Sequence, residues 1–169
     1  GPNYVAQFMR FEETPGRPGD EPLSNPALEA LFHGIVNSSC GVAKESYWRT
    51  LKAIESFDRW WLAEFGAEHD HFRLIGQDNV RRYLPFRAVH VRVSREDSFF
   101  ELSSRVAAVR ATGARTIVSR PPGLETYELD LLEKLTHEWA GMIEFDEETD
   151  ESFADSIANA LEPRCNPHR

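Results

Sequence analysis

The sequence predicts an α/β fold in which helices cover a short parallel sheet, with an extended segment and two helices before it. Residues 86–119 contain an alternating apolar run, a helical apolar stripe and a second short apolar run. Two strands joined by a helix of this length can only be parallel neighbours with a right-handed crossover. Strand and helix patterns then continue to alternate through residues 124–161. This alternation is typical of an α/β sheet.

The first β-α-β unit is marked clearly at its junctions. Valine occupies every second position from residue 89 to 93, which places three β-branched side chains on one face of a strand. Ser98 stands three residues before Glu101, the spacing of a capping box, in which each side chain accepts a hydrogen bond from the other residue's backbone N–H. Gly113 ends the helix, because glycine adopts the left-handed conformation without steric cost. Residues 115–119 form the second strand.

The C-terminal part adds a helix, a strand and a last helix. Residues 124–140 show the apolar stripe of a helix that Gly141 ends, and residues 142–145 follow as a third short strand. Asp150 is expected to cap the last helix, and Pro163 is expected to stop it. The order β-α-β-α-β-α predicts a Rossmann-like half-domain of three layers, with three parallel strands and helices over them.

The chain before the sheet opens with an extended segment and a linker, which together make up residues 1–24. The extended segment carries the large apolar side chains Tyr4, Phe8 and Phe11, and residues 14–22 are rich in proline and glycine. A strand without a partner nearby in the sequence normally pairs with another sheet or another chain. We therefore expect this segment to pair with another sheet, with another chain or with a part of the protein that lies outside this sequence.

Residues 25–85 are predicted to be a helical segment with a polar loop, followed by the Rossmann-like domain at 86–169. Asn25-Pro26 starts the first helix, with asparagine as the cap and proline in the first turn. The helical pattern over residues 42–65, which we call the aromatic helix, carries six aromatic side chains. So many aromatic side chains on one helix imply a large burial surface, either on this domain or on something absent.

Composition excludes several classes of partner. The net charge of -9 argues against nucleic acid and anionic membrane surfaces, and no apolar run approaches the ~20 residues that span a bilayer. We expect a soluble, cytoplasmic protein.

Cys40 and Cys165 are too few and too far apart to form a metal site, and whether they form a disulfide with each other stays open. His69 and His71 have no further ligand within range, so we expect solvated loop residues and no metal site.

Several blocks of the chain resemble bifunctional proline utilization A proteins. The opening GPNYVAQFMR is similar to the segment that follows the last glycines of their Δ1-pyrroline-5-carboxylate dehydrogenase module. Three later blocks resemble successive parts of the C-terminal domain that longer members carry, namely SYWRTLKAIESFDRWWLAEFGAEHD, GQDNVRRYLPFRAVHVRV and ATGARTIVSRPPG. The resemblance covers almost the whole chain, with the blocks in the right order.

The resemblance implies a role within a longer enzyme. That enzyme would oxidise proline to pyrroline-5-carboxylate on FAD and then oxidise glutamate semialdehyde to glutamate with NAD. Both active sites would lie upstream of Gly1, and the family's domain would continue past Arg169. This C-terminal domain would be aldehyde-dehydrogenase-like itself and would cover the path of the intermediate, and the extended segment would correspond to part of a β-flap used in domain or subunit contacts. Its partners would be the catalytic domains of the same polypeptide, contacted through Tyr4, Phe8, Phe11 and the aromatic helix. Assembly into a homo-oligomer is a further alternative.

Arg120 is the one candidate for cofactor binding. RTIVSRPP is similar to the strand and turn of aldehyde dehydrogenases whose lysine contacts the adenosine ribose, and Arg120 takes that place. However, residues 145–151 carry five carboxylates and no glycine where a helix N-terminus would receive the pyrophosphate. Residues 94–97 likewise lack a G-x-G pattern. We expect a vestigial site without a cofactor, and a nucleotide-binding regulatory domain that uses Arg120 is the alternative.

No catalytic residue is predicted in this chain. Cys40 follows two serines at a helix break, but nothing in the sequence places a histidine beside it. His137 lies next to Glu138 on a predicted helix, where a solvated residue is the more common case than a general base.

Overall fold

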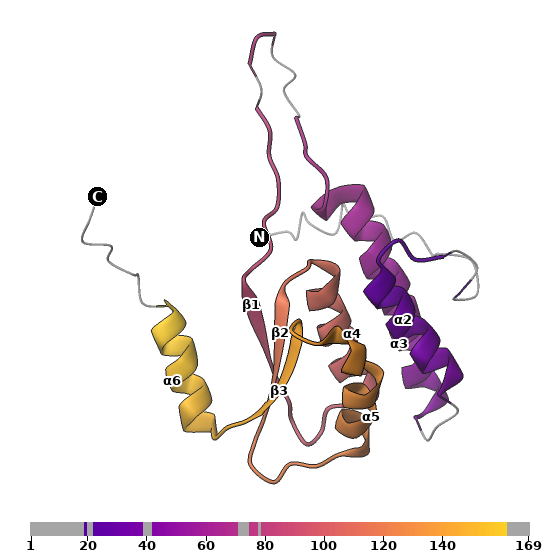
Figure 1. Cartoon of the computed structure of the whole chain (residues 1–169), viewed down its shortest axis with the longest axis vertical. Helices are drawn as coiled ribbons and strands as arrows, with labels where there is room; N and C mark the ends of the chain where they lie inside the picture. Colours follow the sequence, from indigo (N-terminus) through magenta and orange to yellow (C-terminus); the bar gives the residue numbers. More distant parts are fainter. Residues whose placement is uncertain (1–18, 20–21, 39–41, 71–74, 78, 162–169) are drawn as a thin grey trace, which may run out of the picture.

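The computed structural model describes residues 19, 22–38, 42–70, 75–77 and 79–161 (Figure 1). The elements follow one another in this order: α2 (Pro26–Asn37), α3 (Lys44–Trp60), the π-helix η1 (Trp61–Phe65), β1 (Ala88–Arg92), α4 (Phe99–Ala111), β2 (Arg115–Arg120), α5 (Tyr127–Leu135), the 3-10 helix η2 (His137–Trp139), β3 (Ile143–Glu147) and α6 (Asp150–Leu161). The predicted alternation of strands and helices, and the two helices before the sheet, are confirmed. Tyr4, Phe8, Phe11, Cys40 and Cys165 lie outside the described residues.

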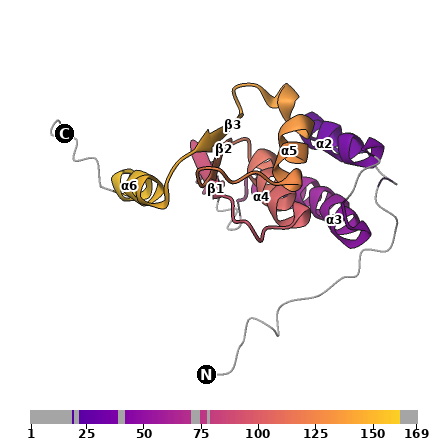
Figure 2. The same cartoon turned by 90° about the horizontal axis from the view of Figure 1, so that it is seen from below.

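The three strands form one parallel sheet in the order β1-β2-β3. Val91 lies opposite Val118, and Val118 lies opposite Phe145, so these side chains share one face. Both α4 and α5 cover that face, because two successive crossovers of the same hand in one direction place their helices on the same side. α6 leaves β3 toward the opposite side (Figure 2). The fold is a small half-Rossmann-like α/β fold, as the sequence predicts.

One hydrophobic core joins the sheet to all four helices on its covered face. α2 and α3 pack behind α4 and α5, as Figure 2 shows. The largest fully buried side chains come from every one of these elements: Leu28, Leu31, Ile35, Leu51, Ile54, Val93, Leu102, Val106, Val118, Leu129 and Leu132. Each buried side chain of this size contributes about 1.5–3 kcal/mol relative to exposure. The predicted helical segment and the predicted Rossmann-like domain therefore share their interior.

Side-chain caps fix where α2 and α4 begin. The side chain of Asn25 accepts hydrogen bonds from the first free N–H groups of α2, as predicted. The carboxylate of Asp58 on α3 accepts three more, from the backbone N–H groups of Ser24 and Asn25 and from the Ser24 hydroxyl. At α4 the predicted capping box forms, with Ser98 and Glu101 bonded reciprocally. Donation from the Ser98 N–H and hydroxyl lowers the pKa of the Glu101 carboxyl below its usual value.

Three predicted boundaries are wrong. The helix predicted over residues 124–140 begins only after its cap Thr126 and ends at Leu135, because the hydroxyl of Thr136 bonds the Leu132 carbonyl and a 3-10 turn follows. β3 runs two residues further than predicted, to Glu147. Asp150 does not cap α6 but is its first residue, and the hydroxyl of Thr149 accepts from the Ser152 N–H instead. Within the described residues, no helix combines the length and the hydropathy that crossing a bilayer requires.

Candidate functional site

The carboxyl edge of the sheet is the first candidate site, because ligands of open α/β sheets bind outside the carboxyl ends of the strands. Arg92 ends β1, and Ser119 and Arg120 end β2. These three residues are the hydrogen-bond donors that a phosphate would meet at this edge. The next residues along the sheet are acidic, since β3 ends in Asp146 and Glu147.

Arg92 is the centre of a polar cluster at this edge. Its guanidinium donates to the Ser119 hydroxyl at 2.6 Å, to the Glu148 carbonyl at 3.1 Å and to the Asp150 carboxylate at 2.5 Å. It also lies over the ring of Phe153 at 5.1 Å. The Arg92 side chain is 18% exposed, so its bonds to Ser119 and Glu148 are largely shielded from water, whereas the Asp150 carboxylate is exposed. One arginine therefore ties β1 to β2 and to the start of α6.

The other two donors are bound to the same acidic turn. The buried hydroxyl of Ser119 donates to the Glu148 carboxylate at 2.6 Å. Arg120 lies opposite Glu147 in the strand register, its Nε is 3.6 Å from that carboxylate, and one Nη donates to the Leu124 carbonyl. Each donor at the edge thus already has an acceptor in residues 147–150. A bound phosphate would have to displace these carboxylates.

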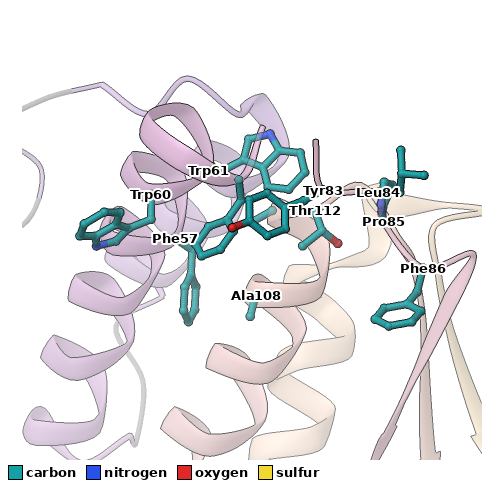
Figure 3. A pocket seen from close by; sticks show the side chains of 11 residues that line it. Phe57, Trp60, Trp61, Tyr83, Leu84, Pro85, Phe86, Ala108 and Thr112 are labelled. Carbon is teal, nitrogen blue, oxygen red and sulfur yellow. The ribbon is translucent and has the colours of Figure 1, made fainter. Parts of the chain in front are cut away.

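An apolar pocket of about 320 Å³ is the second candidate site (Figure 3). It lies where the end of α3, η1, an extended segment and the end of α4 come together. Its lining comes from three parts of the chain: Phe57, Trp60, Trp61 and Phe65; Tyr83, Leu84, Pro85 and Phe86; and Ala108, Ala111 and Thr112. No charged side chain lines it, and the hydroxyl of Thr112 donates to the Val109 carbonyl. We call it the aromatic pocket.

The π-helix η1 gives the aromatic pocket its shape. The N–H of Gly66 donates to the Trp61 carbonyl at 2.7 Å, a bond that spans five residues. A β-carbon on Gly66 would lie only 2.9 Å from the indole nitrogen and from the carbonyl oxygen of Trp61. Glycine is therefore required for this approach of the indole. The sequence predicted one continuous helix over these residues, whereas the structure changes from α-helix to π-helix at Trp61. Gly66 is the one residue in the sequence that indicates this change.

Glu64 holds the extended segment against η1. Its carboxylate accepts from the Arg81 guanidinium at 3.3 Å and from the Tyr83 hydroxyl at 3.4 Å. His69 and Arg81 exchange two backbone hydrogen bonds, and the Tyr83 ring meets the Phe65 ring edge to face. The two ends of the loop that begins after η1 are thereby joined at its base, which places Tyr83 in the pocket wall.

Several large apolar side chains that line the aromatic pocket are exposed to solvent. The exposed fraction is 52% for Trp60, 72% for Leu84 and 78% for Phe86. Phe65 and Tyr83, which also line the pocket, are exposed as well. We call these five residues the aromatic surface. The predicted burial surface of the aromatic helix is thus only partly covered by the described residues.

The remaining sequence candidates line neither site. His69 bonds the Glu64 carbonyl at 2.8 Å, and His71 lies outside the described residues. His137 is an exposed residue of η2 whose Nδ1 lies 3.0 Å from the Lys134 carbonyl. Among the described residues, no group of histidine, cysteine and carboxylate side chains could hold a metal ion. Sequence reasoning missed Arg92, although its alternation with the buried valines placed it on the polar face of β1.

Comparisons with protein family models, with curated proteins and with solved structures found no match to this chain.

Proposed function

We propose that this chain is a non-catalytic C-terminal domain of a bifunctional enzyme of proline catabolism, which oxidises proline to glutamate by way of pyrroline-5-carboxylate. FAD and NAD would be cofactors of the upstream modules, and this domain would support assembly and the passage of the intermediate between them. The sequence blocks that resemble this family motivate the proposal. The observation that carries it is the aromatic surface, because five large apolar side chains that line one pocket and are exposed to solvent mark a site of protein contact.

The carboxyl edge supports a role without a cofactor. Arg92, Ser119 and Arg120 all bond acceptors of the turn at 147–150, so the positions that would receive a phosphate hold carboxylates. A bound dinucleotide would place its negative charges beside these acids, which is unfavourable. The domain would instead dock on the catalytic domains of the same polypeptide. The contacts would be made by the aromatic helix and by Tyr4, Phe8 and Phe11.

The test removes the aromatic surface from the longer enzyme and measures coupling. Trp60→Ala combined with Phe86→Ala should delay the appearance of NADH from proline, while each half-reaction assayed alone keeps its rate, because only the transfer of the intermediate depends on the docked domain. Trp48→Ala is the matched control, since Trp48 is 40% exposed and lies outside the aromatic pocket. An unchanged lag in the double variant would contradict the proposal.

A nucleotide-binding regulatory domain is the second candidate, and the place of Arg120 at the carboxyl edge favours it. The Arg120 side chain is 29% exposed, so part of the guanidinium faces water. Titration of the chain with NAD by calorimetry separates the two functions. Saturable heat that Arg120→Ala abolishes would support the regulatory site, whereas no heat would count against it.

A further inference from the structure

Two carboxylates of the acidic turn at residues 147–150 occupy the main hydrogen-bond donors of the carboxyl edge. Glu148 accepts from the Ser119 hydroxyl at 2.6 Å, and Asp150 accepts from the Arg92 guanidinium at 2.5 Å. Ser119 is fully buried and the Arg92 side chain is 18% exposed, so the fold holds both donors in place. Guanidinium and hydroxyl groups held in this way are typical donors to phosphate and carboxylate oxygens. The two carboxylates therefore lie where an anionic ligand would bind.

The two donors belong to one site. The Arg92 guanidinium donates to the Ser119 hydroxyl oxygen at 2.6 Å, so the two side chains are in contact. The Glu148 carbonyl and the Phe153 ring hold the same guanidinium from two further directions. Withdrawal of the two carboxylates would leave a cation and a buried hydroxyl without their acceptors, which is unfavourable unless another anion replaces them.

α6 controls the position of both carboxylates. Asp150 is its first residue, and the Ser152 hydroxyl in the same turn donates to the Glu148 carboxylate at 3.3 Å. Beyond Phe153, residues 154–159 are exposed, and the hydrophobic core includes no described residue of α6. The helix stands away from the other helices in Figure 2. Displacing α6 from the sheet would therefore withdraw both carboxylates and leave the core intact.

We propose that the acidic turn and the first turn of α6 form an autoinhibitory lid over an anion site, in which Arg92 and Ser119 are the donors. The ligand is a small molecule with two anionic groups, because the closed edge holds two separate carboxylates. A diphosphate and a dicarboxylate share this chemistry. The ligand binds only after Glu148 and Asp150 are displaced, so its apparent affinity is lowered by the fraction of chains in which the lid is open.

This inference goes beyond the proposed function and does not rest on it. The carboxyl edge and the aromatic surface share no residue. Loss of coupling in the aromatic variants would therefore say nothing about the lid, and anion binding at the edge would say nothing about docking.

The first experiment opens the lid by substitution and measures anion binding by calorimetry. Glu148→Ala with Asp150→Ala should bind pyrophosphate or glutarate about tenfold or more tighter than the parent chain, because the open fraction rises from about a tenth or less to nearly one. Glu151→Ala with Asp155→Ala is the matched control, which removes the same charge from exposed positions of α6. Adding Arg92→Met to the opened variant should abolish the gain. Equal affinities of the opened and control variants for both probes would overturn the inference.

The second experiment uses the unaltered chain, so it does not depend on the folding of a variant. Binding and lid opening are reciprocal, because a ligand that binds only the open state must favour that state. Saturating pyrophosphate should speed amide hydrogen exchange in α6 about threefold or more, while exchange in α4 stays unchanged. Sodium chloride at the same ionic strength is the reference, since salt alone weakens exposed ion pairs. Exchange in α6 that pyrophosphate leaves unchanged or slows would overturn the inference.

Discussion

Replacing Arg92 tests whether one arginine holds the carboxyl edge together. Arg92→Met keeps the apolar stem and removes the charge. Two bonds to shielded partners are lost, to the Ser119 hydroxyl and the Glu148 carbonyl, and charge-assisted bonds are worth about 1.5–3 kcal/mol each. The bond to Asp150 adds about 0–1 kcal/mol, because that carboxylate is 89% exposed. After allowance for the apolar methionine, we expect a loss of about 2–4 kcal/mol in the free energy of unfolding.

Urea denaturation measures this loss, and amide hydrogen exchange locates it. Exchange should accelerate first in α6, because Arg92 joins that helix to β1. Arg115→Met is the matched control on the same face of the sheet, where Arg115 pairs with Glu144 in an exposed ion pair. That variant should lose less than about 1 kcal/mol. A loss under about 0.5 kcal/mol in Arg92→Met, with α6 exchange unchanged, would refute the reasoning.

Three further predictions concern the aromatic pocket and the helix starts. Gly66→Ala should lower the free energy of unfolding by about 1–3 kcal/mol and shift tryptophan emission, because the new β-carbon meets Trp61; unchanged emission would contradict the description of η1. Asp58→Asn should lower the free energy of unfolding by about 1–3 kcal/mol in urea denaturation, because the amide replaces one of the carboxylate oxygens that accept from Ser24 and Asn25; a loss as small as that of Glu55→Gln, which removes an acceptor of one exposed hydrogen bond, would contradict this role of Asp58. The lowered pKa of Glu101 stabilises the fold above the usual carboxyl pKa of 4.5, and this contribution is lost as the pH falls through the lowered pKa. Glu101→Gln should therefore flatten the acid side of the plot of unfolding free energy against pH, measured by urea denaturation at several pH values; the same slope as in the parent chain would contradict this role of Glu101.

Local signals in the sequence predicted most of the fold. The Asn25 cap, the capping box of Ser98 and Glu101 and the alternating valines each act over a few residues, and each is confirmed. The boundaries that failed depend on contacts that a short window does not contain. β3 extends to Glu147 because β2 continues to Arg120 beside it and offers a partner for two further residues.

The contacts that form the candidate sites could be predicted from the sequence only in part. Arg120 was predicted in the turn after the second strand but is the last residue of β2, and its pairing with Glu147 follows from the register between two strands. The aromatic helix was predicted to be a burial surface, yet the aromatic pocket also needs the segment held by Glu64 through Arg81 and Tyr83. These contacts join residues 17 and 19 positions apart across a loop, and no periodic pattern indicates them.

The attachment of α6 to the sheet through its first turn has a mechanical consequence. Its first turn meets the sheet through Asp150 and Phe153, whereas Ile157 one turn later is 42% exposed. A pulling force applied to the C-terminal end of α6 would act on Arg92 with the whole helix as a lever arm. Under such a load the helix would peel from the strand ends while the ladder between β1 and β2 stays intact. α6 would then extend the chain by a defined length before the core bears any tension.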